Sequence, residues 1–220
     1  MIDDPHGKDY YAVRYQANSH RKLVWKEIIR ALSRYIPNDP AVLELGPGYC
    51  DFINQLPARK KIAVDINPLA CKYANPDIEF MTGDCTRLPT VEPSSMDVVF
   101  ASNLLEHLEK AEVLRLLQSA YVVLRPGGKL ILMQPNFRYS YDQYYDDYTH
   151  TTPFTDKGLC GLLKSEGYRI VDCVPRFLPL SMETAGWIPR PWWIIRLYLN
   201  LPIRPFAKQM LVVAEKPTES

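Results

Sequence analysis

Residues 42–51 read VLELGPGYCD, an apolar run that leads directly into a turn with two glycines and then to an acid. Such a turn lets a ligand approach the backbone closely, because Gly46 and Gly48 have no Cβ to obstruct it. A second acid, Asp65, ends the next apolar run about 20 residues after Glu44, a spacing typical of nucleoside-binding α/β domains. The stretch therefore predicts a crevice in which a carboxylate accepts hydrogen bonds from two ribose hydroxyls.

A Gly-x-Gly turn alone is equally compatible with a purely structural tight turn. The dinucleotide fingerprint G-x-G-x-x-G needs a third glycine near the pyrophosphate, and this chain has Asp51 at that place. A carboxylate there repels a pyrophosphate. An NAD-type oxidoreductase is therefore a disfavoured alternative.

Short apolar runs alternate with helical stretches along the chain, which indicates a mostly parallel sheet covered by helices. Five parallel strands are predicted at residues 41–45, 61–65, 78–81, 97–101 and 129–133. A helix with apolar positions from Val113 to Leu124 precedes the last of them and stops at a Pro-Gly-Gly sequence. A helix near 155–166 and strands near 168–174 and 210–214 follow, and those two strands can form an antiparallel hairpin with a long insertion.

The length of 220 residues suits one domain, with three parts. Residues 1–37 hold an amphipathic helix that ends at Pro37 and is expected to pack on the sheet or to cover the cofactor as a lid. Residues 38–135 form the cofactor-binding core, and residues 136–220 supply an acceptor-side loop, an insertion and the terminal hairpin.

Charge and cysteine usage exclude several classes of protein. Lys and Arg total 26 against 25 Asp and Glu, so no nucleic-acid partner is expected. The five cysteines include no close pair, which argues against a disulfide framework or a zinc site. The polar first residues and the absence of an apolar run of about 20 residues predict a cytoplasmic protein.

Four blocks in the same order and spacing carry a family resemblance over about residues 40–135: Glu44-Leu45-Gly46-Pro47-Gly48, Asp65, Gly83-Asp84-Cys85 and Arg125-Pro126-Gly127-Gly128-Lys129-Leu130. Together they resemble the class I S-adenosylmethionine-dependent methyltransferases. The resemblance implies a Rossmann-like, seven-stranded, mostly parallel α/β sheet with helices on both faces and an antiparallel final strand. Cys50 departs from the pattern, because many members carry a third glycine there.

The resemblance also implies a cofactor site. The turn at Gly46 and Gly48, after Glu44, would lie against the methionine part of S-adenosylmethionine, and Asp65 would bind the ribose. The adenine would be read by Asp84 and the Cys85 amide, although Asp84 could instead only cap the following turn. The remaining implied contacts are Ile66 on the adenine ring and the backbone of Ser102 and Asn103 after strand four.

Two histidines are candidates for chemistry on the acceptor. Methyl transfer needs mainly alignment and water exclusion, and a base only where the acceptor must lose a proton. His150 ends the loop that covers the acceptor pocket in relatives, and its ordinary pKa range suits a general base. His107 lies in a Leu-Glu-His block that more often supports a helix start than acts on substrate.

The loop 137–148 packs five tyrosines and three aspartates into twelve residues. Aromatic faces beside carboxylates suit a sugar ring or a flat polar acceptor, although the tyrosines could equally pack beneath the loop. A metal set of Asp142, Asp146 and His150 has no established ligand spacing, so no metal is predicted.

Residues 184–214 contain no acid but several arginines, tryptophans and leucines. This composition suits peripheral membrane contact through residues 187–206, or a wall for a lipid-linked acceptor. The alternative is an insertion packed on the core or on a second subunit. The oligomeric state is left open.

The function predicted is S-adenosylmethionine-dependent methylation, by in-line transfer to an oxygen of a small-molecule, saccharide or lipid-linked acceptor. The alternative from another class is a non-catalytic partner or scaffold that keeps the fold.

Overall fold

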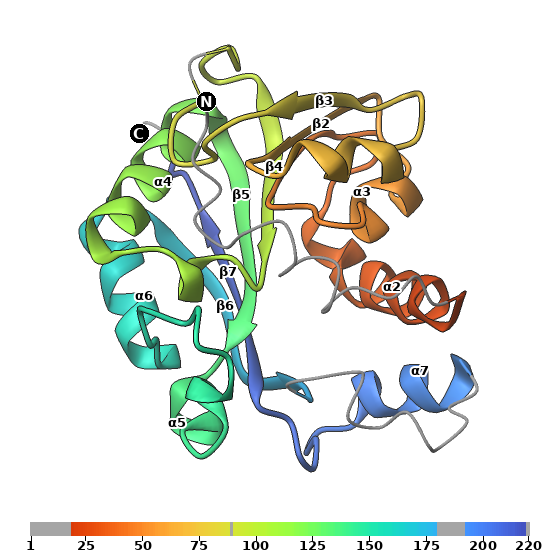
Figure 1. Cartoon of the computed structure of the whole chain (residues 1–220), viewed down its shortest axis with the longest axis vertical. Helices are drawn as coiled ribbons and strands as arrows, with labels where there is room; N and C mark the ends of the chain where they lie inside the picture. The colour runs from red at the N-terminus through yellow and green to blue at the C-terminus, as the bar shows by residue number, and fades with distance from the viewer. Residues whose placement is uncertain (1–18, 89, 180–191, 219–220) are drawn as a thin grey trace.

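The computed structural model describes residues 19–88, 90–179 and 192–218, which form one sheet with helices on both faces (Figure 1). The sheet has seven strands in the order β3-β2-β1-β4-β5-β7-β6. Their bounds are β1 Ala41–Leu45, β2 Lys60–Asp65, β3 Glu79–Thr82, β4 Met96–Ser102, β5 Leu124–Pro135, β6 Arg169–Leu178 and β7 Gln209–Glu215. The first five strands run parallel, whereas β7 is antiparallel to both β5 and β6. The predicted fold class and terminal hairpin are confirmed.

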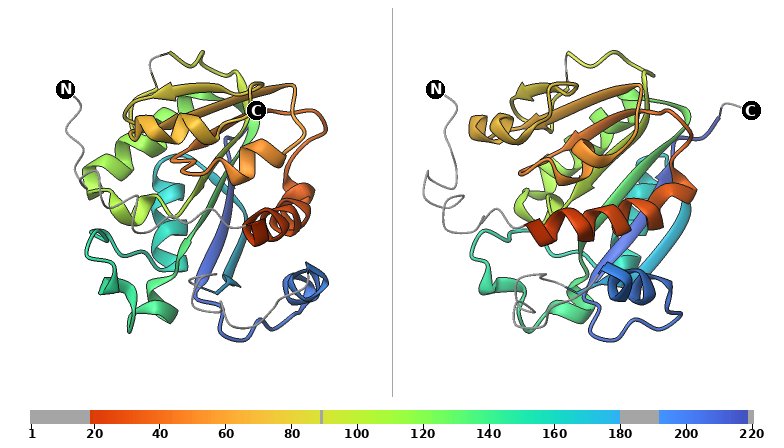
Figure 2. Two further views of the ribbon diagram at one scale, coloured as in Figure 1. Left: turned by 45° about the vertical axis from the view of Figure 1, so that its right-hand side comes forward. Right: turned by 90° about the vertical axis from the view of Figure 1, so that its right-hand side faces the viewer.

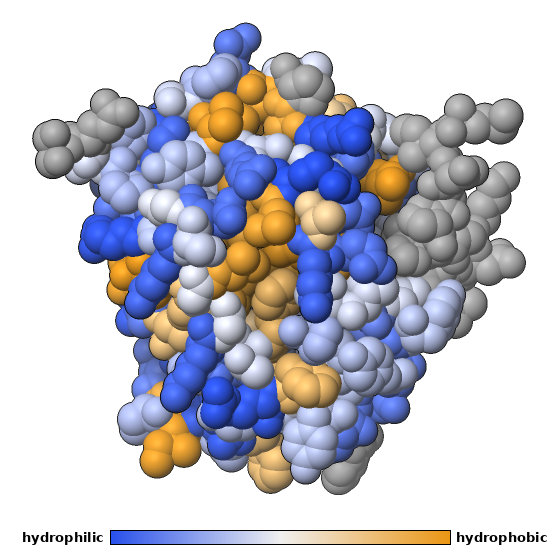
Figure 3. Space-filling model, turned by 90° about the vertical axis from the view of Figure 1, so that its left-hand side faces the viewer, coloured by the Kyte–Doolittle hydropathy of each residue, from blue (hydrophilic) through white to orange (hydrophobic). Residues whose placement is uncertain are grey.

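Helices cover the two faces of this sheet in separate groups (Figures 1 and 2). One face carries α2 (Ser19–Leu32), α3 (Asp51–Gln55) and α7 (Trp192–Asn200). The other carries α4 (Lys110–Val123) and α6 (Asp156–Ser165), and there apolar side chains reach the surface between polar ones (Figure 3). The short helix α5 (Phe137–Ser140) follows β5, and four 3-10 turns are η1 Ser33–Tyr35, η2 Pro68–Tyr73, η3 Leu105–His107 and η4 Tyr144–Asp146.

The element limits differ from the sequence-based ones where tertiary contacts override periodicity. The helix expected to reach Pro37 ends at Leu32 and continues as η1. β5 begins at Leu124, well before the predicted residue 129, because Leu124 pairs with Met96 and a bulge separates this pair from the regular register. β6 extends to Leu178 across a register shift against β7.

Helix α2 packs on the sheet, as one of the two readings of the N-terminal segment predicted. Trp25 lies edge-on to the rings of Phe52 and Phe100, with centroids 6.3 and 6.1 Å away. Ile28 and Leu32 are fully buried in the same cluster. At its amino end Arg21 pairs with Asp51 at 2.9 Å, which ties α2 to the first residue of α3.

The strand order reverses direction at β1, because the chain adds β2 and then β3 on one side of β1 and then crosses over to add β4 on the other side. Connections leaving β1 and β4 then diverge to opposite faces, and a crevice opens at their carboxyl ends. The polar residues that follow these strands are therefore brought to one edge of the sheet.

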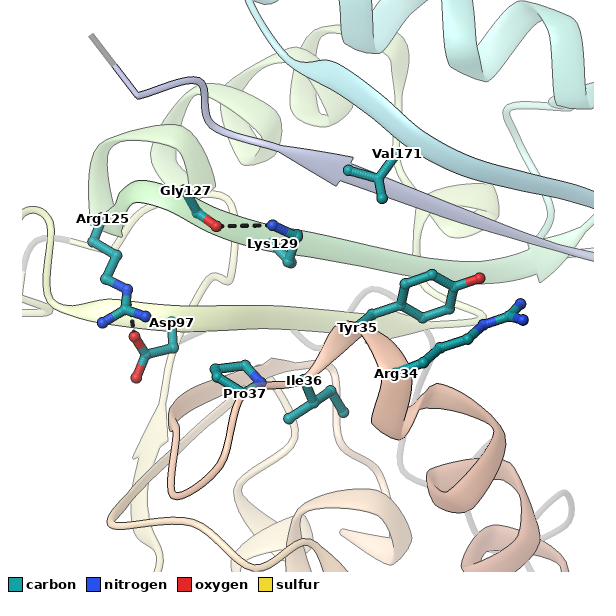
Figure 4. A pocket seen from close by; sticks show the side chains of 9 residues that line it. All are labelled: Arg34, Tyr35, Ile36, Pro37, Asp97, Arg125, Gly127, Lys129 and Val171. Carbon is teal, nitrogen blue, oxygen red and sulfur yellow. Dashed lines mark hydrogen bonds and ion pairs between the residues drawn. The ribbon is translucent and has the colours of Figure 1, made fainter.

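The opposite, amino edge is held by a buried carboxylate (Figure 4). Asp97, at the start of β4, accepts a hydrogen bond from the Ala41 amide at 2.7 Å. It also pairs with Arg59 at 2.6 Å and with Arg125 at 2.5 Å. A cavity of about 310 Å³ between Arg125 and Tyr35 lies at this edge, far from the carboxyl ends of the strands.

We expect Asp97→Ala to lower the free energy of unfolding by about 2–4 kcal/mol, because the amide of Ala41 and two guanidinium groups lose their shared acceptor. Urea unfolding followed by circular dichroism measures this change. The matched control is Asp142→Ala, which breaks an exposed ion pair with Lys208 and should cost less than about 1 kcal/mol. Equal losses in the two variants would contradict the anchoring role.

Candidate functional site

The turns after β1, β2 and β3 are joined by backbone hydrogen bonds at the carboxyl edge of the sheet. The Gly46 amide donates to the Val64 carbonyl, and the Gly83 amide donates to the Asp65 carbonyl, both at 2.9 Å. The three predicted cofactor-binding turns are therefore adjacent in space.

The glycine turn has the geometry that its sequence predicts. Gly46 and Gly48 have φ values of 62° and 53°, in the left-handed region that favours glycine. A Cβ on Gly46 would lie 3.0 Å from Leu104 Cδ1, so this backbone also passes close to the segment after β4. Cys50 adopts φ 57° despite its side chain, and the departure from the family pattern therefore leaves the local backbone left-handed.

Glu44 supports the turn from inside the domain. Its side chain is buried, and its Oε2 accepts a hydrogen bond from the Ile53 amide of α3 at 3.1 Å. Burial raises the pKa of this carboxyl well above its usual range. The hydrogen bond from Ile53 lowers the pKa, and the negative charges of Asp51 and Asp65 raise it further. The structure shows Glu44 holding α3 on β1, and its contact with the cofactor stays a prediction.

Asp65 lies at the end of β2 and connects two loops. Its Oδ2 accepts from the Gly48 amide at 3.1 Å, and its Oδ1 accepts from the Asn67 amide at 2.8 Å. Burial raises the pKa of this carboxyl, while the two amide bonds act in the opposite direction. Each oxygen keeps a second lone pair, which is the capacity that a ribose diol requires.

A cavity of about 280 Å³ lies beside Asp65, at the carboxyl ends of β2 and β3. Asp84 lines it together with the residues Val64, Met81, Thr82, Gly83, Arg87, Leu88 and Thr90. Asp84 Oδ1 also accepts from the Thr86 amide at 2.8 Å, so the side chain caps the following turn, as the alternative reading predicted. Cys85 is buried and Ile66 partly buried, and burial raises the pKa of the Cys85 thiol to about 12.

The end of β4 completes the crevice. The Ser102 hydroxyl oxygen is buried and makes no hydrogen bond with any residue that the structure describes. Asn103 is held in a left-handed conformation, with its amide donating to the Met133 carbonyl and its Oδ1 accepting from Gln209, both at 2.9 Å. An unsatisfied buried hydroxyl beside a glycine turn and an acid suits a polar ligand.

The two candidate histidines lie next to each other just beyond β4. The rings of His107, in η3, and His150, after the tyrosine loop, have centroids 4.9 Å apart in an edge-to-face arrangement. His107 Nδ1 is 2.9 Å from the Thr149 hydroxyl oxygen, and His150 Nδ1 is 2.6 Å from the Tyr144 carbonyl. The structure thus brings together two residues that sequence reasoning treated separately.

Comparison with known proteins gives a consistent result. Residues 43–132 match the family described as the methyltransferase domain. The match covers less than half of the chain, and it supports the assignment to the class I S-adenosylmethionine-dependent methyltransferases. The recognition made from the four sequence blocks is confirmed, and S-adenosylmethionine is the cofactor. No curated protein matches the sequence.

Solved structures show the same fold. The chain is similar to a SAM-dependent methyltransferase from Archaeoglobus fulgidus at 23% identity and TM-score 0.69, covering 89% of this chain and 94% of that one. It is similar to a protein from Pyrococcus horikoshii at 17% identity and TM-score 0.68, covering 96% and 99%. A putative methyltransferase from Haloferax volcanii, solved with the Trm112 methyltransferase activator, has 17% identity and TM-score 0.67, covering 89% and 90%.

The residues of this methyltransferase domain fit the cofactor. The cavity at Asp84 has apolar walls for a flat base, and Asp65 offers acceptors for a diol. The left-handed Gly46 and Gly48 expose backbone beside the buried Ser102 hydroxyl. The individual cofactor contacts stay predictions that rest on this fit.

The tyrosine loop divides between buried and exposed side chains. Tyr144 is 1% exposed and donates its hydroxyl to the Thr152 carbonyl at 2.8 Å. Tyr139 lies beneath the Arg176 guanidinium, which is 5.0 Å from its ring centroid. The three exposed members are Tyr141, Tyr145 and Tyr148. The packed reading is confirmed for Tyr144, and a role of the exposed tyrosines in binding an acceptor stays a prediction.

Sequence reasoning missed Glu106 as a site residue. Its side chain is 2% exposed, and burial, with the nearby charge of Asp147, raises the pKa of its carboxyl to about 8. Its carbonyl accepts hydrogen bonds from the Thr151 and Thr152 amides, which fixes the loop on η3. The available signal was the acid next to a histidine in the leucine-rich Leu-Leu-Glu-His-Leu block.

Helix α7, in the described part of the insertion near the carboxyl end, packs on α2. Ile195 and Leu199 of α7 are buried, and Arg196 pairs with Glu27 of α2 at 2.9 Å. Trp193 and Leu197, on the other side of α7, are 53% and 57% exposed. The side chain of Trp192 and residues 187–191 lie outside the described residues.

We expect Asp65→Ala to weaken S-adenosylmethionine binding by about 1–3 kcal/mol, because two ribose hydroxyls lose a charged acceptor. Isothermal titration calorimetry measures the affinity. The control Asp77→Asn changes an exposed acid near the amino end of β3 and should leave the affinity unchanged. Unchanged affinity in a folded Asp65→Ala protein would show that the assignment of the ribose site is wrong.

Proposed function

We propose that this methyltransferase domain transfers the methyl group of S-adenosylmethionine to an oxygen of a small-molecule, saccharide or lipid-linked acceptor. The observation that carries the proposal is the pair His107 and His150, whose rings meet 4.9 Å apart beside the end of β4. Two side chains that can form hydrogen bonds with a hydroxyl group therefore lie close to the end of β4, which borders the crevice.

The cofactor, when bound, supplies a methyl group on a positively charged sulfur. The chain's own residues then have two tasks: holding the two reactants in line and keeping water out. Asp65 and the glycine turn serve the first task, since they fix the nucleoside end against β1 and β2. The segment after η4 serves the second, because Thr151 and Thr152 fasten it over the end of η3.

The loop offers a surface for a ring-shaped acceptor. Tyr145 packs edge-on against Tyr144, with centroids 5.2 Å apart, and remains 58% exposed. Aromatic faces of this kind stack on sugars and flat polar rings. Small polar acceptors and saccharides are therefore favoured over proteins or nucleic acids.

The surroundings of His150 support a role with the acceptor's proton. Its side chain is only 10% exposed, and its Nε2 is 3.4 Å from Asp147 Oδ2. A carboxylate beside an imidazole stabilises the charged ring that forms when a proton is taken up. The non-catalytic scaffold remains the competing reading, and release of S-adenosylhomocysteine distinguishes the two.

We expect His150→Ala to slow methyl transfer by about 100-fold or more while S-adenosylmethionine binds with nearly wild-type affinity. The assay measures S-adenosylhomocysteine formation with a panel of catechols, sugars and lipid-linked saccharides between about pH 5 and pH 9. Asp146→Asn, an exposed acid of the same loop, is the control and should keep wild-type rates. Equal activity of His150→Ala and wild type over this range would remove His150 from the mechanism.

The lipid-linked class receives separate support from the insertion. Trp193, Leu197, Ile203 and Phe206 are all more than half exposed, within a stretch that has arginines and no acid. Tryptophan favours the headgroup level of a bilayer, and arginines favour anionic lipid. No helix among the described residues is long and apolar enough to span a membrane, so the contact proposed is with the surface of an anionic bilayer.

We expect the protein to co-sediment with anionic vesicles more than with neutral ones at low salt, and the double change Trp193→Ser and Leu197→Ser to reduce the bound fraction by roughly fivefold. Val122→Ser is the matched control, because it removes an equally exposed apolar side chain from α4 on the other face. If wild type ignores anionic vesicles, the segment is a pocket wall or a subunit contact instead.

A further inference from the structure

Glu106 is a buried carboxylate for which the described part of the chain supplies no partner. It is 2% exposed, and neither of its side-chain oxygens makes a hydrogen bond with a described residue. A buried carboxylate without partners is costly, because desolvation disfavours its charge. Such a group needs either a proton or a cation.

The histidine beside it has its tautomer set by a neighbour. The Thr149 hydroxyl donates its hydrogen to Asp147 Oδ1 at 2.7 Å. Toward His107 Nδ1, at 2.9 Å, the same oxygen can therefore only accept, which places a hydrogen on Nδ1. Nε2 of the neutral ring then carries the lone pair.

The same reasoning applies to His150. A backbone carbonyl can only accept, so the 2.6 Å contact from His150 Nδ1 to the Tyr144 carbonyl also places the hydrogen on Nδ1. Both rings thus donate through Nδ1 to an oxygen. Metal-binding histidines are oriented in this way, by a second hydrogen bond to a carbonyl, a carboxylate or a similar acceptor.

Glu106, His107 and His150 each offer one ligand atom, and these three atoms all lie within 4.8 Å of one another. Ligands at about 2.0–2.2 Å from a shared cation are roughly 3–3.5 Å apart, so small side-chain rotations close the set. We propose that Glu106, His107 and His150 form a binding site for one divalent transition-metal cation at the acceptor end of the crevice.

The ligand types define the class of cation. Two imidazoles and one carboxylate suit Zn²⁺, Co²⁺, Fe²⁺ or Mn²⁺, whereas Mg²⁺ prefers sites made of oxygen atoms. Three protein ligands leave coordination positions open, as in catalytic rather than structural sites. The set considered from sequence alone is not assembled in this way, because Asp142 is engaged by Lys208 at 3.0 Å.

This inference rests on the proposed function for its chemical role. A cation at this place lowers the pKa of a hydroxyl that binds to it, so the acceptor is deprotonated near neutral pH and its proton passes to solvent. The oxygen then forms a bond to the methyl carbon while the sulfur–carbon bond breaks, and the electron pair of that bond remains on sulfur. His150 serves as a ligand in this scheme rather than as the proton acceptor.

The competing occupant of the site is a proton. Protonated His150 would pair with Asp147 across 3.4 Å, and a protonated Glu106 would need no counter-charge. A cluster suited only to protons shows no stoichiometric metal binding, whereas the proposed site releases its protons when it binds the cation. Direct metal binding therefore separates the two states.

The test uses full-length protein without an affinity tag, stripped of metal by a chelator. We expect calorimetry to show one Zn²⁺ per chain with a Kd of about 1 μM or tighter, little binding of Mg²⁺, and visible absorption bands when Co²⁺ is added. Glu106→Gln and His150→Gln should each weaken Zn²⁺ binding by at least tenfold and abolish the Co²⁺ bands. Asp146→Asn should bind as wild type does.

A second pair of variants keeps the test valid if those proteins fold poorly. Thr149→Val removes the acceptor for His107 Nδ1 and should weaken Zn²⁺ binding by about 10- to 100-fold, whereas Thr149→Ser should retain it. Titrating S-adenosylmethionine into the same samples tests the proposed function independently. Wild-type protein that binds the cofactor but no stoichiometric Zn²⁺ or Co²⁺, or Zn²⁺ binding that none of the variants weakens, overturns the proposed metal site.

Discussion

The parallel pairing of β1 with both β2 and β4 is the constraint on which the rest of the structure depends. This pairing places the carboxyl ends of three strands at one edge of the sheet. The connections that leave β1 and β4 then run to opposite faces of the sheet. Asp65 then joins the β1 and β2 turns, since its two oxygens accept amide hydrogens from Gly48 and Asn67. The cofactor site is thus a consequence of strand order, held in shape by one carboxylate.

The cluster of Glu106, His107 and His150 depends on a second, non-local contact, between η3 and the segment after η4. Backbone bonds from Thr151 and Thr152 to the Glu106 carbonyl bring the two histidines together without using their side chains. Each imidazole is held through its Nδ1, whereas the Glu106 carboxylate makes no hydrogen bond with a described residue. Because backbone hydrogen bonds hold the two segments together, substitutions of side chains in this cluster should leave the arrangement of the segments unchanged.

The sequence predicted the features that depend on neighbouring residues and missed those that depend on contacts between residues distant in the chain. Strands β1 to β4 and the caps of α6 are local signals, and their predicted limits were accurate to about one residue. The crevice residues were also predictable, because glycines, strand-end acids and their spacing are local. The exposure of each tyrosine in the loop was not, since it depends on contacts such as that of Tyr144 with Thr152.

The cluster of Glu106, His107 and His150 was hidden for the same reason. Its members come from two segments that no periodicity connects, and the adjacent pair reads locally as the beginning of a helix. Only the fold shows that His150 faces η3, at 4.9 Å between ring centroids. Burial of α7 on α2 likewise depends on partners distant in sequence, such as Arg196 and Glu27.

Electrostatics connects the two ends of the crevice. The cofactor brings one positive charge, and a divalent cation at the acceptor would add two more, which repel the sulfonium strongly in a site of low dielectric constant. Two buried carboxylates, Glu106 at 2% and Asp147 at 5% exposure, lie in or beside the histidine cluster and would offset that charge. With both ionised, the two carboxylates and the cation together would carry no net charge, and the attraction between a deprotonated acceptor and the sulfonium would be preserved. The Glu106 carboxylate, whose burial without a described partner is unfavourable in the empty protein, would thus suit the charge of the proposed site.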